Sequence, residues 1–174
     1  VDYFDYYLIH DMGGNRRKAG EDKHIFSFLC AKKKRGLVKQ IGFCFHDTAD
    51  VLDRILTEHP EVDFVQIQLN YLDWENDTIQ SRKCYETAKR HGKPVIVMEP
   101  VKGGTLANIP QEAENLFRTY HPDLSVASWA IRFAASHENV MLVLSGMSTL
   151  EQVKDNLSYM ENFTPFTEEE YGLV

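Results

Sequence analysis

The sequence predicts an α/β fold of about five parallel β/α units, which amounts to a partial (β/α)₈ TIM barrel. Five short apolar runs, rich in strand-forming residues, alternate with amphipathic helical segments, as expected for a parallel sheet with right-handed crossovers. Polar residues follow every run, and no Gly-x-Gly-x-x-Gly follows the first one. Both observations favour a barrel over a doubly wound sheet. We assign residues 1–163 to the partial barrel and residues 164–174 to a C-terminal tail.

The first half of the chain contains three strand and helix pairs. Gly36 ends the first helix, and Thr48 is the expected N-cap of the second helix, which stops before Pro60. Gly92 closes the third helix. The elements predicted here are strands at about 6–10, 39–45 and 64–69, with helices at 25–35, 49–58 and 78–91.

The second half contains two more strands and a longer connection between them. Ser125 is the expected start of the helix that precedes the fifth strand. Thr167 resembles the start of a further short helix. The elements predicted here are strands 95–98 and 140–144, a short helix at about 111–120, a helix from 125 and a last helix at 150–160.

Composition excludes several classes of function. The formal net charge of −7 makes a nucleic-acid or anionic-membrane partner unsuitable, because such partners need a positive field. Three widely spaced cysteines encode neither a disulfide framework nor a structural zinc site, which favours a cytoplasmic setting. No apolar run approaches the ~20 residues of a membrane span. A buried strand begins within a few residues of Val1, so we expect a truncated fragment of a longer protein.

Three features at the strand tips suggest chemistry. His10 ends the first apolar run, where parallel α/β folds place catalytic groups, although a lone histidine there is more often structural. Gln66 is an amide among apolar neighbours, which favours a ligand over simple satisfaction of polar groups. Residues 145–149 lead into a helix N-terminus, whose backbone N–H groups favour a phosphate.

Five segments together resemble the middle and end of the aldo/keto reductase family, in order and over essentially the whole chain. The likeness is closest to a bacterial branch that carries a ferredoxin-like iron-sulfur domain after the barrel, with which the chain shares LNYLDW (69–74) and LSGMST (144–149). The five segments are DYYLIH (5–10), GLVKQIGFC (36–44), QIQLNY (66–71), EPVKGGTL (99–106) and SGMSTLEQ (145–152).

The resemblance implies strands four to eight of the family's barrel and a specific reaction. The family reduces carbonyl groups with hydride from NAD(P)H, using a Tyr acid, a Lys, an Asp and a His. Only the His has a counterpart here, His10, which would donate a second hydrogen bond to the carbonyl oxygen. We therefore expect the parent protein to be the enzyme and this chain alone to be inactive. An iron-sulfur cluster is possible in the parent protein but not in this chain.

The resemblance also places a cofactor, NADP or NAD, without fixing which. The carboxamide-binding positions correspond to Cys44, Phe45 and Gln66, and Met98 occupies the place of a stacking aromatic ring. Lys102 would offset the charge of Glu99 near the pyrophosphate. The cofactor-binding positions implied by the resemblance are Cys44, Gln66, Met98, Glu99, Lys102, Gly146, Ser148, Gln152 and Asn156.

Two other classes of function remain open at this stage. His10-Asp11 and His46-Asp47 end adjacent strands, and imidazole with carboxylate suits a divalent metal, so a metal-dependent barrel hydrolase is one alternative. A non-catalytic scaffold is the other. A partial barrel also leaves edge strands 6–10 and 140–144 without partners, which predicts self-association through those edges.

Overall fold

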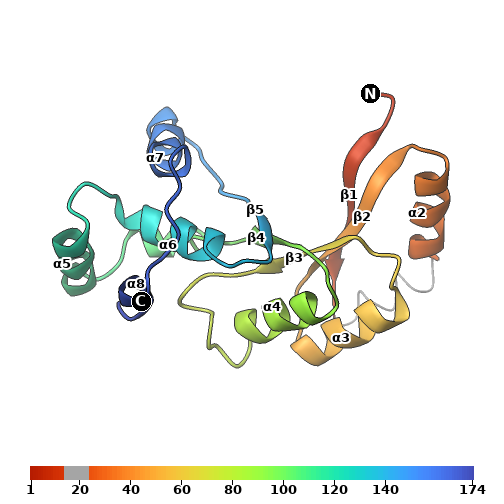
Figure 1. Ribbon diagram of the computed structural model, residues 1–174, viewed down its shortest axis with the longest axis horizontal. Helices are drawn as coiled ribbons and strands as arrows, with labels where there is room; N and C mark the ends of the chain where they lie inside the picture. Colours follow the sequence, from red (N-terminus) through yellow and green to blue (C-terminus); the bar gives the residue numbers. More distant parts are fainter. Residues whose placement is uncertain (14–23) are drawn as a thin grey trace.

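The computed structural model describes residues 1–13 and 24–174, and its centre is one five-stranded parallel sheet (Figure 1). The strands follow each other across the sheet in chain order, from β1 to β5. Helices alternate with the strands, so the predicted α/β architecture is confirmed. The strands are β1 (Phe4–Met12), β2 (Val38–Phe45), β3 (Phe64–Gln68), β4 (Val95–Met98) and β5 (Val140–Val143). The helices are α2 (Ile25–Lys34), α3 (Ala49–Glu58), α4 (Ser81–Arg90), the 3₁₀ turn η1 (Thr105–Ala107), α5 (Gln111–Tyr120), α6 (Val126–Ala135), α7 (Leu150–Met160) and α8 (Glu168–Tyr171).

Most predicted boundaries are confirmed, and the two largest differences have local causes. Helix α4 begins at Ser81 instead of residue 78, because the side chain of Asn76 accepts the N–H groups of Thr78 and Ile79, each at 2.9 Å. These bonds stabilise a turn in place of the first helical turn. Strand β1 continues to Met12, past a register shift in which Asp11 has a φ of 59°.

The two faces of the sheet differ in what covers them. One face packs against the helices. It carries Phe43, Val65 and Val97, one from each inner strand, which have no exposed surface and belong to the hydrophobic core. The other face carries Gln66 and Met98, which are only half-buried. Because side chains alternate along a strand, Phe64 and Ile96 share this face, and both are buried. The part of the face around Gln66 and Met98 is partly exposed.

The two outer strands are much more exposed than the three inner ones. Tyr6 on β1 and Leu142 on β5 each keep 47% of their surface exposed. Each of these strands pairs with one neighbour, β1 with β2 and β5 with β4, in the described part of the chain. The sheet is therefore open, with β1 and β5 as its edges, well separated in Figure 1.

The C-terminal segment packs against the rest of the molecule. Phe166 is buried in the core cluster, and a capping box at Thr167 starts α8, as predicted. The carboxylate of Glu170 is 1% exposed and accepts a hydrogen bond from the guanidinium of Arg132 on α6, at 2.7 Å. Residues 164–174 therefore pack against α6, while the boundary at residue 163 stays a prediction.

No helix in the described ranges has the length and apolar character needed to cross a bilayer. The three cysteines are all free thiols.

Candidate functional site

A pocket of about 330 Å³ lies beyond the carboxyl ends of β4 and β5, between the loops that follow them and helices α6 and α7. Glycine-rich backbone and a few polar side chains line it, which is the usual character of a small-molecule site. Four predicted cofactor-binding residues, Glu99, Gly146, Gln152 and Asn156, belong to its wall. The structure therefore brings together residues that are far apart in the sequence.

The loop at 99–104 forms one wall of this pocket and has an unusual backbone. Glu99, Lys102, Gly103 and Gly104 all have positive φ, at 56°, 49°, 59° and 93°. Glycine adopts this conformation freely, whereas each of the two other residues costs about 1 kcal/mol or more. The carbonyl of Glu99 offsets part of this cost by accepting hydrogen bonds from the side chain of Asn70 at 3.0 Å and from the N–H of Lys102 at 3.1 Å.

A buried carboxylate lies behind the same loop. Asp73 is 1% exposed and accepts hydrogen bonds from Gln68 at 2.7 Å, Asn70 at 2.9 Å and the amine of Lys102 at 2.5 Å. Burial alone would raise the pKa of Asp73, but these donors outweigh it, so its pKa lies below the ordinary value. The amine of Lys102 is thus paired with Asp73; a role for it near a pyrophosphate stays a prediction.

The helix N-terminus after β5 is capped by its own side chains. Gln152 accepts the N–H groups of Ser148 at 2.7 Å and Thr149 at 3.1 Å, and Thr149 in turn accepts the N–H of Gln152. This reciprocal arrangement is a capping box. A phosphate that binds the N–H groups of Ser148 and Thr149, as the resemblance implies, would have to displace the amide of Gln152.

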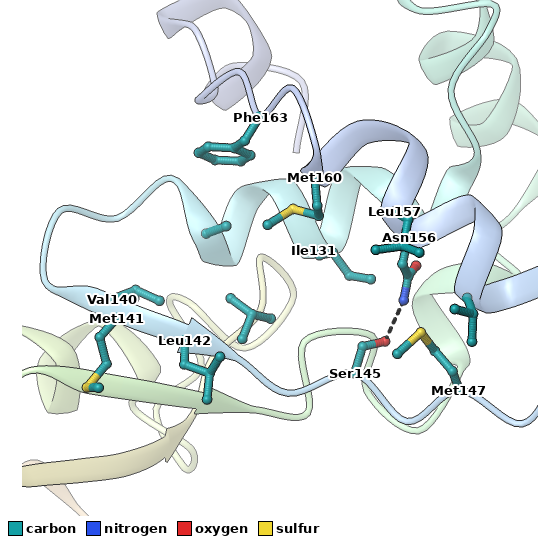
Figure 2. A pocket seen from close by; sticks show the side chains of 13 residues that line it. Ile131, Val140, Met141, Leu142, Ser145, Met147, Asn156, Leu157, Met160 and Phe163 are labelled. Carbon is teal, nitrogen blue, oxygen red and sulfur yellow. Dashed lines mark hydrogen bonds between the residues drawn. The ribbon is translucent and has the colours of Figure 1, made fainter. Parts of the chain in front are cut away.

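Asn156 is held in a fixed orientation between two partners. Its amide N–H donates to Ser145 at 3.0 Å, the contact drawn in Figure 2, and its oxygen accepts from Tyr159 at 2.6 Å. Ser145 and Asn156 also belong to the wall of a second, mostly apolar groove of about 400 Å³ between β5, α6 and α7. In Figure 2 the side chains of Leu157 and Met160 face Ile131 and β5 across that groove. The Asn156 amide therefore lies where the two hollows meet.

Gln66 and Met98 lie side by side on neighbouring strands. Cross-strand register pairs Gln66 with Ile96 and Gln68 with Met98, and the amide of Gln66 donates to the sulfur of Met98 at 3.4 Å. Within the described part of the chain, the amide oxygen of Gln66 accepts no hydrogen bond. The two side chains therefore form one partly exposed spot on this face of the sheet.

Six predicted residues lie outside the pocket wall: His10, Cys44, Gln66, Met98, Lys102 and Ser148. Cys44 is 1% exposed on β2 and its sulfur accepts the N–H of Asp11 at 2.8 Å, while burial raises the pKa of the thiol. His10 is exposed on the edge strand β1, beside the register shift between Ile9 and Met12. The open sheet places His10 and Cys44 on β1 and β2, whereas the pocket lies beyond β4 and β5.

Sequence reasoning missed several residues that shape the site. Ala127 and Ile131 line the pocket from α6, a helix for which the sequence predicted no role in the site. Asp155 also lines it and accepts the hydroxyl of Ser125 at 2.6 Å. The sequence gives one indication of Asp73: it is a carboxylate between the apolar residues Leu72 and Trp74, shortly after the buried strand β3. Helical periodicity identifies a buried face but not the element that it contacts.

The alternative metal site receives no support from the geometry. Within residues 1–13 and 24–174, no group of three or more His, Cys, Asp or Glu side chains is close enough together to hold a metal ion.

Three solved structures that the chain resembles are aldo-keto reductases. The holo form of AKR11C1 from Bacillus halodurans superposes with a TM-score of 0.75 at 23% identity, over 99% of this chain and 58% of that chain. The thermostable Tm1743 in complex with the inhibitor epalrestat gives 0.77 at 20% identity, over 99% and 59%. The Klebsiella pneumoniae reductase in complex with NADP and acetate gives 0.71 at 19% identity, over 99% and 58%.

These likenesses establish the fold, and the chain spans less than two thirds of the length of each of these structures. None of the curated proteins is similar enough to the sequence to count as a match. The family model of the aldo/keto reductases, however, matches residues 1–174. The chain therefore belongs to the aldo/keto reductase family, as its strand-tip segments indicate.

Proposed function

We propose that the whole protein reduces small carbonyl compounds with NAD(P)H and that the 330 Å³ pocket binds the cofactor. The observation that carries the proposal is the convergence of Glu99, Gly146, Gln152 and Asn156 on one hollow beyond β4 and β5. Family membership supports an oxidoreductase. Two neighbours from Klebsiella pneumoniae were solved with NADP or NADPH, which supports a nicotinamide cofactor here.

The bound cofactor would supply a hydride to the carbonyl carbon. Residues of this chain would then hold the reacting partners in place. Gln66 has an amide oxygen and a second N–H free to bond the nicotinamide carboxamide on its polar edge, while Met98 offers an apolar face to the ring. Asn156, fixed by Ser145 and Tyr159, would present its remaining amide hydrogen to the nucleotide end.

His10 would donate a hydrogen bond to the oxygen of the substrate, where negative charge develops as hydride arrives. Its exposed imidazole on β1 is sterically accessible for this role. No counterpart of the family's Tyr, Lys and Asp occurs in these 174 residues, so the proton donor is not among them. We therefore expect this chain to bind the cofactor without turning over a substrate.

The charge of the pocket bears on cofactor preference. Glu99 and Asp155 are the charged side chains in the part of its wall that the structure describes, and the amine of Lys102 is paired with Asp73. A 2′-phosphate would bring further negative charge close to two carboxylates, which repels it. We expect NADH to bind at least as tightly as NADPH.

The test is a fluorescence titration of the purified 174-residue chain with NADH and with NADPH. We expect saturable binding, with a dissociation constant of roughly 1 µM to 1 mM, the range typical of enzymes for their substrates. Asn156→Leu should weaken binding, whereas Gln111→Leu on the surface of α5 should not. Failure of both cofactors to bind would refute the cofactor pocket. Turnover of a carbonyl compound by this chain would refute the expected inactivity.

We further infer a cytoplasmic setting for the protein, supported by its three free thiols Cys30, Cys44 and Cys84.

A further inference from the structure

We propose that Asp73 and Lys102 form a positioning pair that holds the loop at 99–104 in the shape required for the cofactor pocket. The inference rests on the proposed function of that pocket but concerns residues outside its wall. Val101 and Gly103 both line the pocket, and the residue between them, Lys102, does not. Its side chain extends to the carboxylate of Asp73 instead.

The pair is a built feature of the fold, because both oxygens of the carboxylate accept hydrogen bonds. One oxygen of Asp73 accepts from Lys102 at 2.5 Å, and the other accepts from Gln68 at 2.7 Å and Asn70 at 2.9 Å. The backbone N–H of Asp73 also donates to the side chain of Asn70 at 2.9 Å. Asn70 is fully buried, and its amide also reaches the carbonyl of Glu99. A continuous set of hydrogen bonds thus links the tip of β3 to the loop after β4.

The backbone of the loop explains why such a link is needed. Glu99 and Lys102 both adopt positive φ, a conformation that their side chains disfavour. The hydrogen bonds at the Glu99 carbonyl and the ion pair at the Lys102 side chain act at these two residues. Without them the loop would relax toward an ordinary turn, and the wall built from Glu99, Val101 and Gly103 would change shape.

The two partners are not equivalent, which makes the inference testable. Asp73 is 1% exposed, whereas the side chain of Lys102 is 33% exposed and can turn toward water. Removal of the lysine leaves a buried charge without its cation, whereas removal of the carboxylate leaves a lysine that can be hydrated. Lys102→Met should therefore disturb the loop more than Asp73→Asn does.

The first experiment measures hydrogen exchange in the 174-residue chain without any cofactor. The N–H groups of Lys102, Gly104 and Leu106 donate to carbonyls within the loop, so they report its shape. We expect these amides to exchange about tenfold faster in Asp73→Asn, and faster still in Lys102→Met, because local opening becomes easier. The amide of Lys93, bonded to Ala88 at the end of α4, should not change.

The second experiment measures NADH binding by fluorescence in the same variants. Both single variants should weaken binding by roughly tenfold. The double variant should resemble Asp73→Asn instead of showing the sum, because Asp73→Asn also removes the buried charge that Lys102→Met leaves unpaired. In a form of the protein that turns over, the KM for the cofactor should rise while kcat changes little. The control is Glu138→Gln, which removes the exposed Lys89–Glu138 ion pair of 2.8 Å.

Unchanged loop exchange in both single variants would overturn the positioning role, whatever the binding result. Additive effects on binding would also overturn it, since they would mean independent residues. If loop exchange rises as expected and the unaltered chain binds neither cofactor, the pair is confirmed as a loop-positioning device and the proposed function fails instead.

Discussion

The three inner strands of the sheet are buried by the rest of the chain, whereas the two edge strands remain partly exposed. Phe43 on β2, Val65 on β3 and Val97 on β4 have no exposed surface. On the edges, Tyr6 of β1 and Leu142 of β5 keep 47% of theirs. The inner strands therefore carry the stability of the sheet, because burial of apolar area is the main driving force of folding.

The predicted site residues are also divided between inner and edge strands. Gln66 and Met98 lie on the inner strands and already contact each other. His10 lies on an edge strand, and Gly146 follows the other edge strand in open space. The predicted cofactor contacts Gln66 and Met98 thus lie together on neighbouring inner strands, whereas His10, the predicted catalytic residue, lies on an edge strand.

The largest effect should come from a single methyl group between two inner strands. A Cβ added to Gly42 on β2 would lie 2.6 Å from the ring and the carbonyl oxygen of Phe64 on β3. We expect Gly42→Ala to lower the free energy of unfolding by about 3 kcal/mol, since neither atom can move without disturbing the strand. The measurement is a urea denaturation curve. Gly146→Ala is the control, because nothing lies within 4 Å of its added methyl group, and an equal loss in both variants would refute the comparison.

A smaller, pH-dependent effect should come from His137, at the junction of α6 and β5. Its ring stacks on Trp74 at 4.4 Å between centroids, and its buried Nε2 has no hydrogen-bond partner among the described residues. Burial lowers the pKa of His137 to about 4 from an ordinary 6.5. The unfolded chain therefore binds a proton at a higher pH than the folded one. The contribution of neutral His137 to stability is complete above pH 6.5 and is lost as the pH falls toward 4.

His137→Phe should remove this part of the acid sensitivity while it keeps the stack on Trp74. The measurement is the urea midpoint at several pH values between 8 and 4.5, for the variant and the unaltered chain. The two slopes should diverge only below pH 6.5. Parallel curves over the whole range would contradict a buried neutral histidine.

The smallest effect on stability should come from a substitution on edge strand β5. Such a substitution should act mainly on self-association. We propose that copies of this chain associate through their exposed edges, because unpaired strands with apolar side chains pair readily. Leu142→Lys should shift the unfolding free energy by no more than about 0.5 kcal/mol, since the site is half exposed. It should weaken self-association in sedimentation velocity.

The matched control is Leu116→Lys on α5, where the leucine is 45% exposed and lies away from both edge strands. Association that persists in Leu142→Lys, or a monomer at all concentrations of the unaltered chain, would contradict the edge model.

Much of the fold was predictable because its signals are local. The bounds predicted for β4, α5 and α7 are the observed ones, since proline, glycine and apolar periodicity mark those segments clearly. The start of α4 was wrong by three residues, because the Asn76 side chain stabilises a competing turn. Such competition depends on which backbone groups come within reach, and composition alone does not show it.

The site was predictable only in part, for a related reason. The family resemblance predicted Glu99, Gly146, Gln152 and Asn156, which the structure brings to one pocket. The same reasoning placed Lys102 beside Glu99 as a charge for the pyrophosphate, whereas the folded chain pairs it with Asp73. That pairing depends on the burial of a carboxylate 29 residues earlier in the chain.

The sequence by itself determined the order of strands and helices, the parallel sheet and the family, because these follow from periodicity, turn chemistry and motifs read along the chain. Only the tertiary structure decided which polar side chains meet. Asp73 binds Lys102, Gln68 and Asn70 because burial makes any missing partner costly. That penalty exists only once the surrounding core has excluded water.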